Sequence, residues 1–342
     1  MDKRLSLLHR ISGIFVATAM LTVAMTANAA NEIVVYTARN EQLIKPLFDA
    51  YTKETGTAIK FLTDKEGALL QKLKAEGANT PADMLITVDA GNLWQASNLG
   101  LLQPVQSKTL LDNVPAHLRD PANQWFGLSV RARTIVYNKD KVKPAALSTY
   151  EDLGNPKWKG RLCLRTSKAV YNQSLVAMMV NEYGEPKTEQ IMKSWVANLA
   201  TSPLSNDTLA MEAVAAGQCD MTVVNTYYFG ALMKKNPKLP LAIFWPNQST
   251  KNSGVHVNIS GAGITRHAKR REDAVKFLEW LSSEKAQNLL ADVNMEYPVN
   301  PKVQTDATVA AWGEFKHNPI NVVKAGELQA TAVKLMDRVR YK

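Results

Sequence analysis

Short apolar strands alternate with helices near the start of the chain, and this order constrains the fold more than any other feature. The strand-like runs and the helical patterns between them lie at residues 32–36, 41–53, 58–62, 67–75, 84–88 and around 93–94. This order predicts an α/β fold with a mostly parallel sheet and helices on both faces. Ligands of such sheets bind at the carboxyl ends of the strands. We therefore expect functional residues in the loops at 36–40, 63–67 and 89–91.

A long strand-like stretch at residues 126–138 predicts that the chain passes from one lobe to another. Further crossovers are expected at residues 255–264 and 296–301. Residues 30–342 are too many for one ordinary core, and repeated crossovers make each lobe discontinuous. The predicted division is an N-lobe of residues 30–133 plus 255–298 and a C-lobe of residues 134–254 plus 299–342. Other predicted elements are a strand at 161–165 and helices at 171–182, 208–216, 271–281, 283–291 and 322–339.

Residues 1–29 have the pattern of a secretory signal peptide. A basic start is followed by an apolar run at residues 14–25 and by Ala27-Asn28-Ala29, whose small residues suit cleavage. The run is short for a membrane-spanning helix. We expect cleavage near Ala29 and export to the periplasm, without a lipid anchor because no Cys lies at the cleavage site.

The chain is basic, with a formal net charge of +10, of which the predicted signal peptide contributes +2. Basic proteins attract anions, acidic surfaces or nucleic acid. Here the Lys and Arg residues are scattered, apart from the run at 269–271, which is expected to be a solvated start of a helix. Because the protein is predicted to be exported, we expect no nucleic-acid partner.

Two cysteines, Cys163 and Cys219, are the only ones in the chain. An even number in an oxidising compartment favours a disulfide. Two buried thiols are the alternative. Because no His pattern accompanies them, they do not predict a zinc site.

A strand that ends in two adjacent tyrosines is the main candidate for a binding site. Residues 221–224 have strand character and run through Asn225 into Tyr227 and Tyr228. Neighbouring residues of a strand point to opposite faces, so both rings reach one ligand only if the chain leaves the strand at Asn225. Asn suits such a turn because it tolerates unusual φ angles. The alternative is that both rings are core or interface aromatics.

Several segments of the chain resemble the periplasmic ferric-ion-binding proteins of bacterial iron-uptake ABC transporters. The segments that carry the resemblance are residues 82–91, 131–133, 155–160, 171–175, 225–228 and 296–298. Together they span essentially the whole mature chain. The resemblance implies a two-lobed type II periplasmic binding protein fold, with crossover strands between the lobes and ferric iron held in the cleft. It also implies an inner-membrane ABC permease and its ATPase as partners, and we expect a monomer.

The resemblance implies particular iron ligands. Tyr171, Tyr227 and Tyr228 match the three tyrosines that bind Fe(III) in the tyrosine-rich branches of the family. Some branches add a His in the first loop or a Glu after the third strand, but Asn40 and Val88 occupy those positions here. The sequence therefore resembles the branch in which an exogenous anion, usually carbonate, completes the shell.

The same resemblance implies an anion-binding role for two arginines. Arg39 matches the anion-pairing Arg of that branch, and Arg131 resembles a second cleft Arg. Asp89 or Glu41 is an alternative that would replace the anion. Without the resemblance, both arginines are equally well explained as partners of surface carboxylates.

The chemistry of the residues agrees with iron. Fe(III) is a hard cation, and hard oxygen donors suit it better than thiolates do. Tyrosine has an ordinary pKa near 10, but a bound cation favours the phenolate at neutral pH. Three phenolates cancel the charge of Fe(III), and an Arg would then balance an added anion through paired N–H groups.

Two other classes of function compete with iron binding. One is a binding protein of the same fold for a small organic or phosphonate-like anion, which Arg39 and Arg131 would suit. The other is an exported enzyme, which we do not expect because no nucleophile with a paired base is visible. Tyr36, Tyr137 and Tyr297 lie in or beside predicted strands and are expected in the core.

Overall fold

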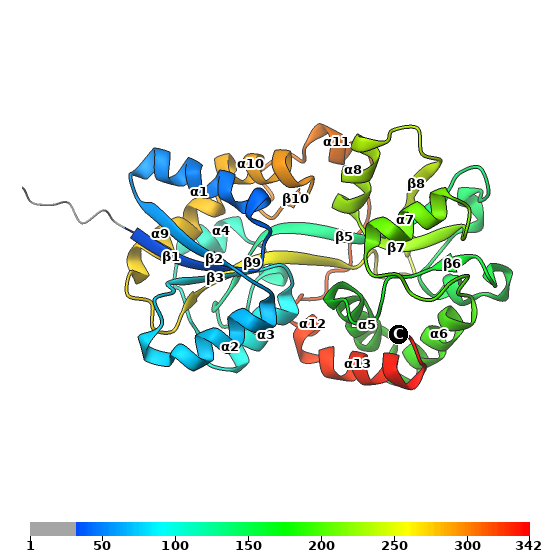
Figure 1. Cartoon of the computed structure of the whole chain (residues 1–342), viewed down its shortest axis with the longest axis horizontal. Coiled ribbons are helices and arrows are strands. Elements are labelled where there is room, and N and C mark those ends of the chain that lie inside the picture. Colours follow the sequence, from blue (N-terminus) through cyan, green and yellow to red (C-terminus); the bar gives the residue numbers. More distant parts are fainter. Residues whose placement is uncertain (1–31) are drawn as a thin grey trace, which may run out of the picture.

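The protein has two lobes that lie side by side and are linked by long strands (Figure 1). The computed structural model describes residues 32–342. The predicted signal peptide at residues 1–29 lies outside the described residues. Among residues 32–342, no helix has both the length and the apolar character that a membrane crossing requires.

The first lobe is built on the predicted strand–helix alternation. Strands β1 (Glu32–Thr37), β2 (Ala58–Thr63) and β3 (Met84–Thr87) are parallel. Strand β9 (Val257–Thr265) returns antiparallel to β3 and also pairs with β4 (Leu102–Gln103). The parallel order of the first three strands is confirmed, but the returning strands make the sheet mixed rather than mostly parallel.

Helices cover both faces of this sheet (Figure 1). They are α1 (Glu41–Thr55), α2 (Glu66–Glu76), α3 (Ala90–Asn98), α4 (Lys108–Asn113), α9 (Arg271–Leu281) and α10 (Glu284–Asn294). Helix α1 begins where the Asn40 side chain accepts a hydrogen bond from Gln42 N, and it ends at Gly56, whose φ of 73° suits glycine. Its buried face includes Leu47 and Tyr51.

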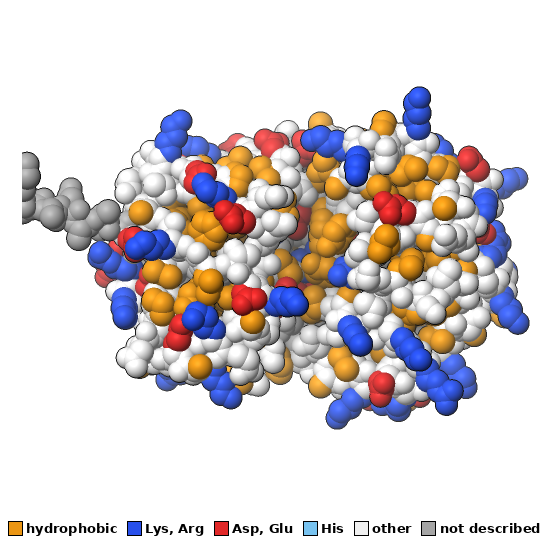
Figure 2. Space-filling model, in the orientation of Figure 1, with side chains coloured by type: hydrophobic (Ala, Val, Ile, Leu, Met, Phe, Trp, Pro, Cys, Tyr) orange, Lys and Arg blue, Asp and Glu red, His pale blue; other side chains and the backbone are white. Residues whose placement is uncertain are grey.

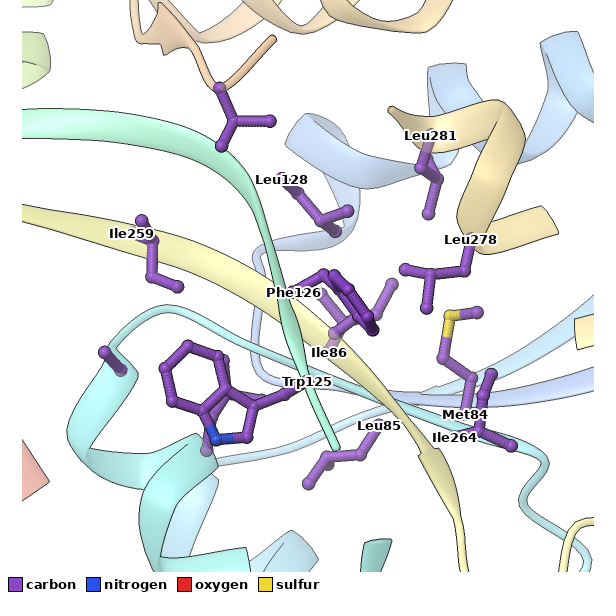
Figure 3. Packing of buried hydrophobic residues seen from close by; sticks show 14 of the residues in the cluster. Met84, Leu85, Ile86, Trp125, Phe126, Leu128, Ile259, Ile264, Leu278 and Leu281 are labelled. Atoms are coloured by element: carbon purple, nitrogen blue, oxygen red, sulfur yellow. The ribbon is translucent and has the colours of Figure 1, made fainter. Parts of the chain in front are cut away.

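Strand β5 (Phe126–Asn138) is the predicted crossover and is buried along its whole length. Its first half pairs with β9 and β10 (Tyr297–Pro298), and its second half pairs with β7 (Met221–Asn225) and β8 (Leu241–Phe244). Phe126 belongs to the core of the first lobe and Ile135 to that of the second. Figure 3 shows part of the first core, where β3, β5 and β9 pack beside helix α9.

The second lobe surrounds the short sheet formed by β5, β6 (Leu162–Cys163), β7 and β8. Its helices are α5 (Val170–Tyr183), α6 (Glu185–Ala197), α7 (Asp207–Ala215), α8 (Thr226–Lys235) and α13 (Gln329–Arg338), while short helices α11 (Ala307–Ala310) and α12 (Lys324–Glu327) lie in the closing segment. The predicted single closing helix is wrong, because Leu328 has ψ near 3° and separates α12 from α13. The proposed lobe boundaries stay a prediction.

A disulfide joins Cys163 to Cys219, as the even cysteine count favoured. Both residues are buried. The bond connects β6 to the segment that enters β7, and β7 leads directly to the paired tyrosines. The disulfide therefore stabilises the strand that positions the candidate site.

Candidate metal centre

A cavity of about 420 Å³ lies in the cleft between the lobes. Figure 2 shows the surface hollowed between the two halves of the molecule. All five residues that the sequence singled out line this cavity: Arg39, Arg131, Tyr171, Tyr227 and Tyr228. The structure therefore brings together side chains that lie far apart in the sequence.

The two adjacent tyrosines face the same cavity because the chain changes from strand to helix beside them. Strand β7 ends at Asn225 and helix α8 begins at Thr226. The rings of Tyr227 and Tyr228 lie 4.4 Å apart between centroids, tilted by 40°. The predicted departure from the strand is confirmed.

The expected role of Asn225 needs correction. Its φ of −76° is ordinary, so the turn requires no unusual backbone. Instead, its side chain links two other groups: Nδ2 donates to the Tyr227 hydroxyl at 3.2 Å, and Oδ1 accepts from Arg133 Nη1 at 3.0 Å. Asn225 thereby orients Tyr227 toward the cavity.

Tyr171 is the second residue of helix α5, near the helix N-terminus as predicted. Guanidinium carbons of Arg131 and Arg165 lie 5.0 and 5.1 Å from the centre of its ring. Burial raises the pKa of Tyr171 to about 12, although the positive charge of Arg131 opposes this rise. Burial also raises the pKa of Tyr227 well above its usual value, and the nearby phenol of Tyr171 adds to that rise. In the metal-free protein both groups are therefore neutral phenols at pH 7.

Arg39 follows strand β1 and is 4% exposed. Its Nη2 donates to Glu296 Oε2 at 2.9 Å, and its Nη1 donates to the Ser260 hydroxyl. Its Nε is buried and has no hydrogen-bond partner among residues 32–342. This one free donor suits an acceptor in the cavity that Arg39 lines.

Arg131 lies on β5 and is paired with a buried carboxylate. Its Nη2 lies 3.1 Å from Asp89 Oδ2, while its buried Nη1 has no hydrogen-bond partner in the described part of the chain. Burial alone would lower the pKa of Arg131, but the Asp89 charge holds it above its usual value. Arg131, like Arg39, forms an ion pair through Nη2 and has one buried nitrogen without a hydrogen-bond partner among the described residues.

Neither carboxylate considered as a replacement for the anion is placed to act as one. Asp89 is fully buried and accepts hydrogen bonds from Gly91 N, Ser174 Oγ and Asn258 Nδ2 besides Arg131. Its oxygens are therefore occupied. Glu41 is exposed and is not among the residues that line the cavity.

Sequence reasoning missed two residues that shape the site. Glu296 lines the cavity and pairs with Arg39. Arg133 holds Asn172, Asp207 and Asn225 together beneath the tyrosines. The spacing of Arg131 and Arg133 on one strand was a usable signal, because residues two apart share a face. Only the three-residue match at 296–298 pointed to Glu296.

The donor set of the cavity suits a hard cation with a charge of 3+. Three phenol oxygens come from two helix starts, and no cysteine is among the described residues that line the cavity. Among the described residues, no group of three or more His, Cys, Asp or Glu side chains is arranged to hold a metal. Hard oxygen ligands favour Fe(III) over softer metals, so the chemistry of the tyrosines selects the type of metal.

Comparisons with known proteins agree with this geometry. Residues 46–317 match the family model of bacterial extracellular solute-binding proteins. Iron uptake protein A1 of Synechocystis sp. is 45% identical over 94% of this chain and 90% of its own. A Trichodesmium structure (IdiA, FutA) in complex with iron and citrate ligands has a TM-score of 0.87 at 44% identity, over 91% of this chain and 100% of that chain.

An open form of Mannheimia haemolytica ferric iron-binding protein A has a TM-score of 0.85 at 38% identity, over 91% of this chain and 99% of that chain. The relatives named here are binding proteins, and their shared architecture is the type II periplasmic binding protein fold. The chain therefore belongs to the family of bacterial extracellular solute-binding proteins and is related to its ferric-iron-binding members.

Proposed function

We propose that the protein captures ferric iron in the cleft between its lobes and delivers it to an ABC permease in the inner membrane. The convergence of Tyr171, Tyr227 and Tyr228 on one cavity carries this proposal. The names of the relatives supply independent support, since they describe iron uptake and ferric iron binding. The tyrosines are the proposed iron ligands.

In this proposal the tyrosines bind iron as phenolates. The charge of Fe(III) stabilises each phenolate, and three of them cancel the charge of the metal. The cation of Arg131 beside Tyr171 also favours the ionised ring. Each ligand loses a proton as it binds, so the cleft exchanges protons for iron.

An exogenous anion completes the iron shell in this proposal. The free donors Arg39 Nε and Arg131 Nη1 are the contacts that support it, because a buried donor without a partner favours an acceptor. Carbonate is the anion that we propose. The structure of the Trichodesmium relative contains iron and citrate ligands, so citrate is the anion to compare with carbonate in binding experiments.

Delivery follows from movement of the lobes about their connecting strands. Strand β5 contributes residues to the cores of both lobes, so closure about it would change the outer surface without breaking either core. A permease with its ATPase would recognise the changed outer surface of the closed protein. The proposed carrier is a periplasmic monomer and performs no catalysis.

A metal-dependence experiment separates this function from binding of an organic anion. The thermal unfolding temperature of iron-stripped mature protein would be measured with chelated Fe(III), and separately with 2-aminoethylphosphonate in the absence of metal. We expect stabilisation by iron alone, and loss of that effect in Tyr228→Phe. Stabilisation by the phosphonate without metal, abolished by Arg39→Ala but kept in Tyr228→Phe, would favour the organic-anion function instead.

A further inference from the structure

The Glu296 carboxylate forms an ion pair with Arg39, the arginine that is expected to bind the anion. Its Oε2 accepts hydrogen bonds from Arg39 Nη2 at 2.9 Å and from Ser129 Oγ at 2.8 Å. Both members of the ion pair are 4% exposed, and both line the cavity. Ser260 accepts from Arg39 Nη1, so Nε is the one nitrogen of this guanidinium that has no hydrogen-bond partner among the described residues.

The backbone beside Glu296 is held in an uncommon conformation. Met295 has φ 53° and ψ 37°, in the left-handed region that residues other than glycine rarely adopt. This turn ends helix α10 and is followed directly by Glu296 and strand β10. Such positions persist where the surrounding structure fixes them, and they cluster at ligand sites. The turn and the Ser129 contact together fix the carboxylate against Arg39.

Both arginines that line the cavity already have a carboxylate partner. Arg39 is paired with Glu296, and Arg131 is paired with Asp89. Three phenolates would cancel the charge of Fe(III). An added carbonate bound at Arg39 would therefore compete with the Glu296 carboxylate for the same guanidinium.

We propose that Glu296 is a specificity-determining residue that weakens the hold of the cleft on exogenous anions and so limits how strongly iron binding depends on them. This inference rests on the proposed function, because it concerns the anion that accompanies iron. Removal of the Glu296 charge would relieve a like-charge repulsion and leave Arg39 without its carboxylate partner. We therefore expect it to tighten anion binding by about tenfold.

Glu296→Gln is the direct test, because Gln keeps the size of the side chain and still accepts hydrogen bonds from Arg39 and Ser129. Glu66→Gln is the matched control: Glu66 also lines the cavity, but no ion pair joins it to a described residue. Glu296→Asp keeps the charge and should behave like the wild type. Bicarbonate is the probe. It would be titrated into iron-loaded protein while the visible absorption band of the iron–phenolate complex (the iron band) is recorded. It would also be titrated into iron-free protein by calorimetry.

We expect the bicarbonate concentration for half-saturation to fall about tenfold in Glu296→Gln and clearly less in Glu66→Gln, because only Glu296 is paired with Arg39. Equal values for these two variants, or weaker binding in Glu296→Gln, would overturn the inference. If Glu296→Gln fails to fold, Ser260→Ala takes its place, because it frees Arg39 Nη1 without removing a charge. A few-fold higher bicarbonate affinity in Ser260→Ala would then support the inference that the partners of Arg39 limit anion binding. An unchanged affinity would refute it.

The two proposals fail in distinguishable ways. Absence of an iron band in the wild type would refute the proposed function, and the calorimetric titrations of iron-free protein would still decide the role of Glu296. A normal wild-type band with unchanged bicarbonate affinity in Glu296→Gln would refute only the inference.

Discussion

The guanidinium carbon of Arg131 lies 5.0 Å from the centre of the Tyr171 ring, although one residue comes from the crossover strand β5 and the other from the start of helix α5. The same guanidinium is paired with Asp89, which in turn accepts a hydrogen bond from Ser174 on α5. A buried network therefore fixes the position of one proposed iron ligand relative to the strand that connects the lobes.

Replacement of Tyr228 by Phe should abolish tight iron binding and leave the fold intact. The substitution removes one oxygen from the proposed shell but keeps the ring that packs 4.4 Å from Tyr227. Tyr297→Phe is the matched control, because its buried hydroxyl has no partner among the described residues. The control should bind iron normally and unfold no more easily than the wild type, since an unpaired buried hydroxyl costs about 1–3 kcal/mol. Tight iron binding by Tyr228→Phe would contradict the ligand assignment.

Arg133→Met should destabilise the protein by about 3–5 kcal/mol, because it leaves a buried carboxylate without its main partner. Arg133 Nη1 lies 2.9 Å from Asp207, which is fully buried. The variant should also bind iron more weakly, since Asn225 loses a contact that holds it beside Tyr227. Urea unfolding and iron titration would measure the two effects.

The control for Arg133 is Arg338→Met. Arg338 pairs with Glu185 and Glu189 on the surface, with side chains that are 38–44% exposed. Exposed pairs of this kind contribute little to stability. Equal destabilisation by the two substitutions would show that the buried network around Arg133 has no special role.

Iron affinity should fall steeply as the pH falls. Burial raises the pKa of Tyr171 to about 12 and also raises that of Tyr227 well above its usual value, so both are protonated in the iron-free protein at neutral pH. Iron must displace these protons, and each proton released lowers the apparent affinity by about tenfold per pH unit. Competition against a chelator of known protonation, from pH 8 to pH 6, would measure the slope. An affinity independent of pH would mean that phenolates do not bind the metal.

Loss of the disulfide should lower stability without removing the iron site. Cys163 and Cys219 are 56 residues apart in sequence, and closing a loop of that length stabilises a protein by about 4 kcal/mol in the chain-entropy estimate. Neither sulfur lines the cavity. The double variant Cys163→Ala, Cys219→Ala should therefore unfold at lower urea but retain its iron band. Unchanged stability would show that the bond does not brace strand β7.

Local patterns in the sequence were enough for the main elements of the fold. The short apolar runs located β1, β2 and β3, and the long strand-like stretch at Phe126–Asn138 was the crossover strand. The break at Leu328 was missed, although Gly326 lies two residues before it. Helix α6 was also missed, and the antiparallel return of β9 depends on contacts between distant segments.

The proposed ligands could be predicted, but their supports could not. The tyrosine pair has a local signature, a strand followed directly by two rings. The partner of Arg39 lies 257 residues away, and that of Arg131 lies 42 residues away. No periodic pattern connects such positions, because tertiary packing alone places these charges together. The resemblance implied an anion for both arginines, and the residues alone left pairing with surface carboxylates as the alternative. The carboxylates that pair with them, Glu296 and Asp89, are buried.

A visible absorption titration of iron-stripped mature protein with chelated Fe(III) tests the central claim most directly. Charge transfer from phenolate to iron gives a coloured band. We predict a band that saturates at one iron per chain, is retained in Tyr297→Phe and is lost in Tyr228→Phe. A colourless complex, or a band of equal strength in Tyr228→Phe, would contradict a tyrosine-bound ferric iron in this cleft.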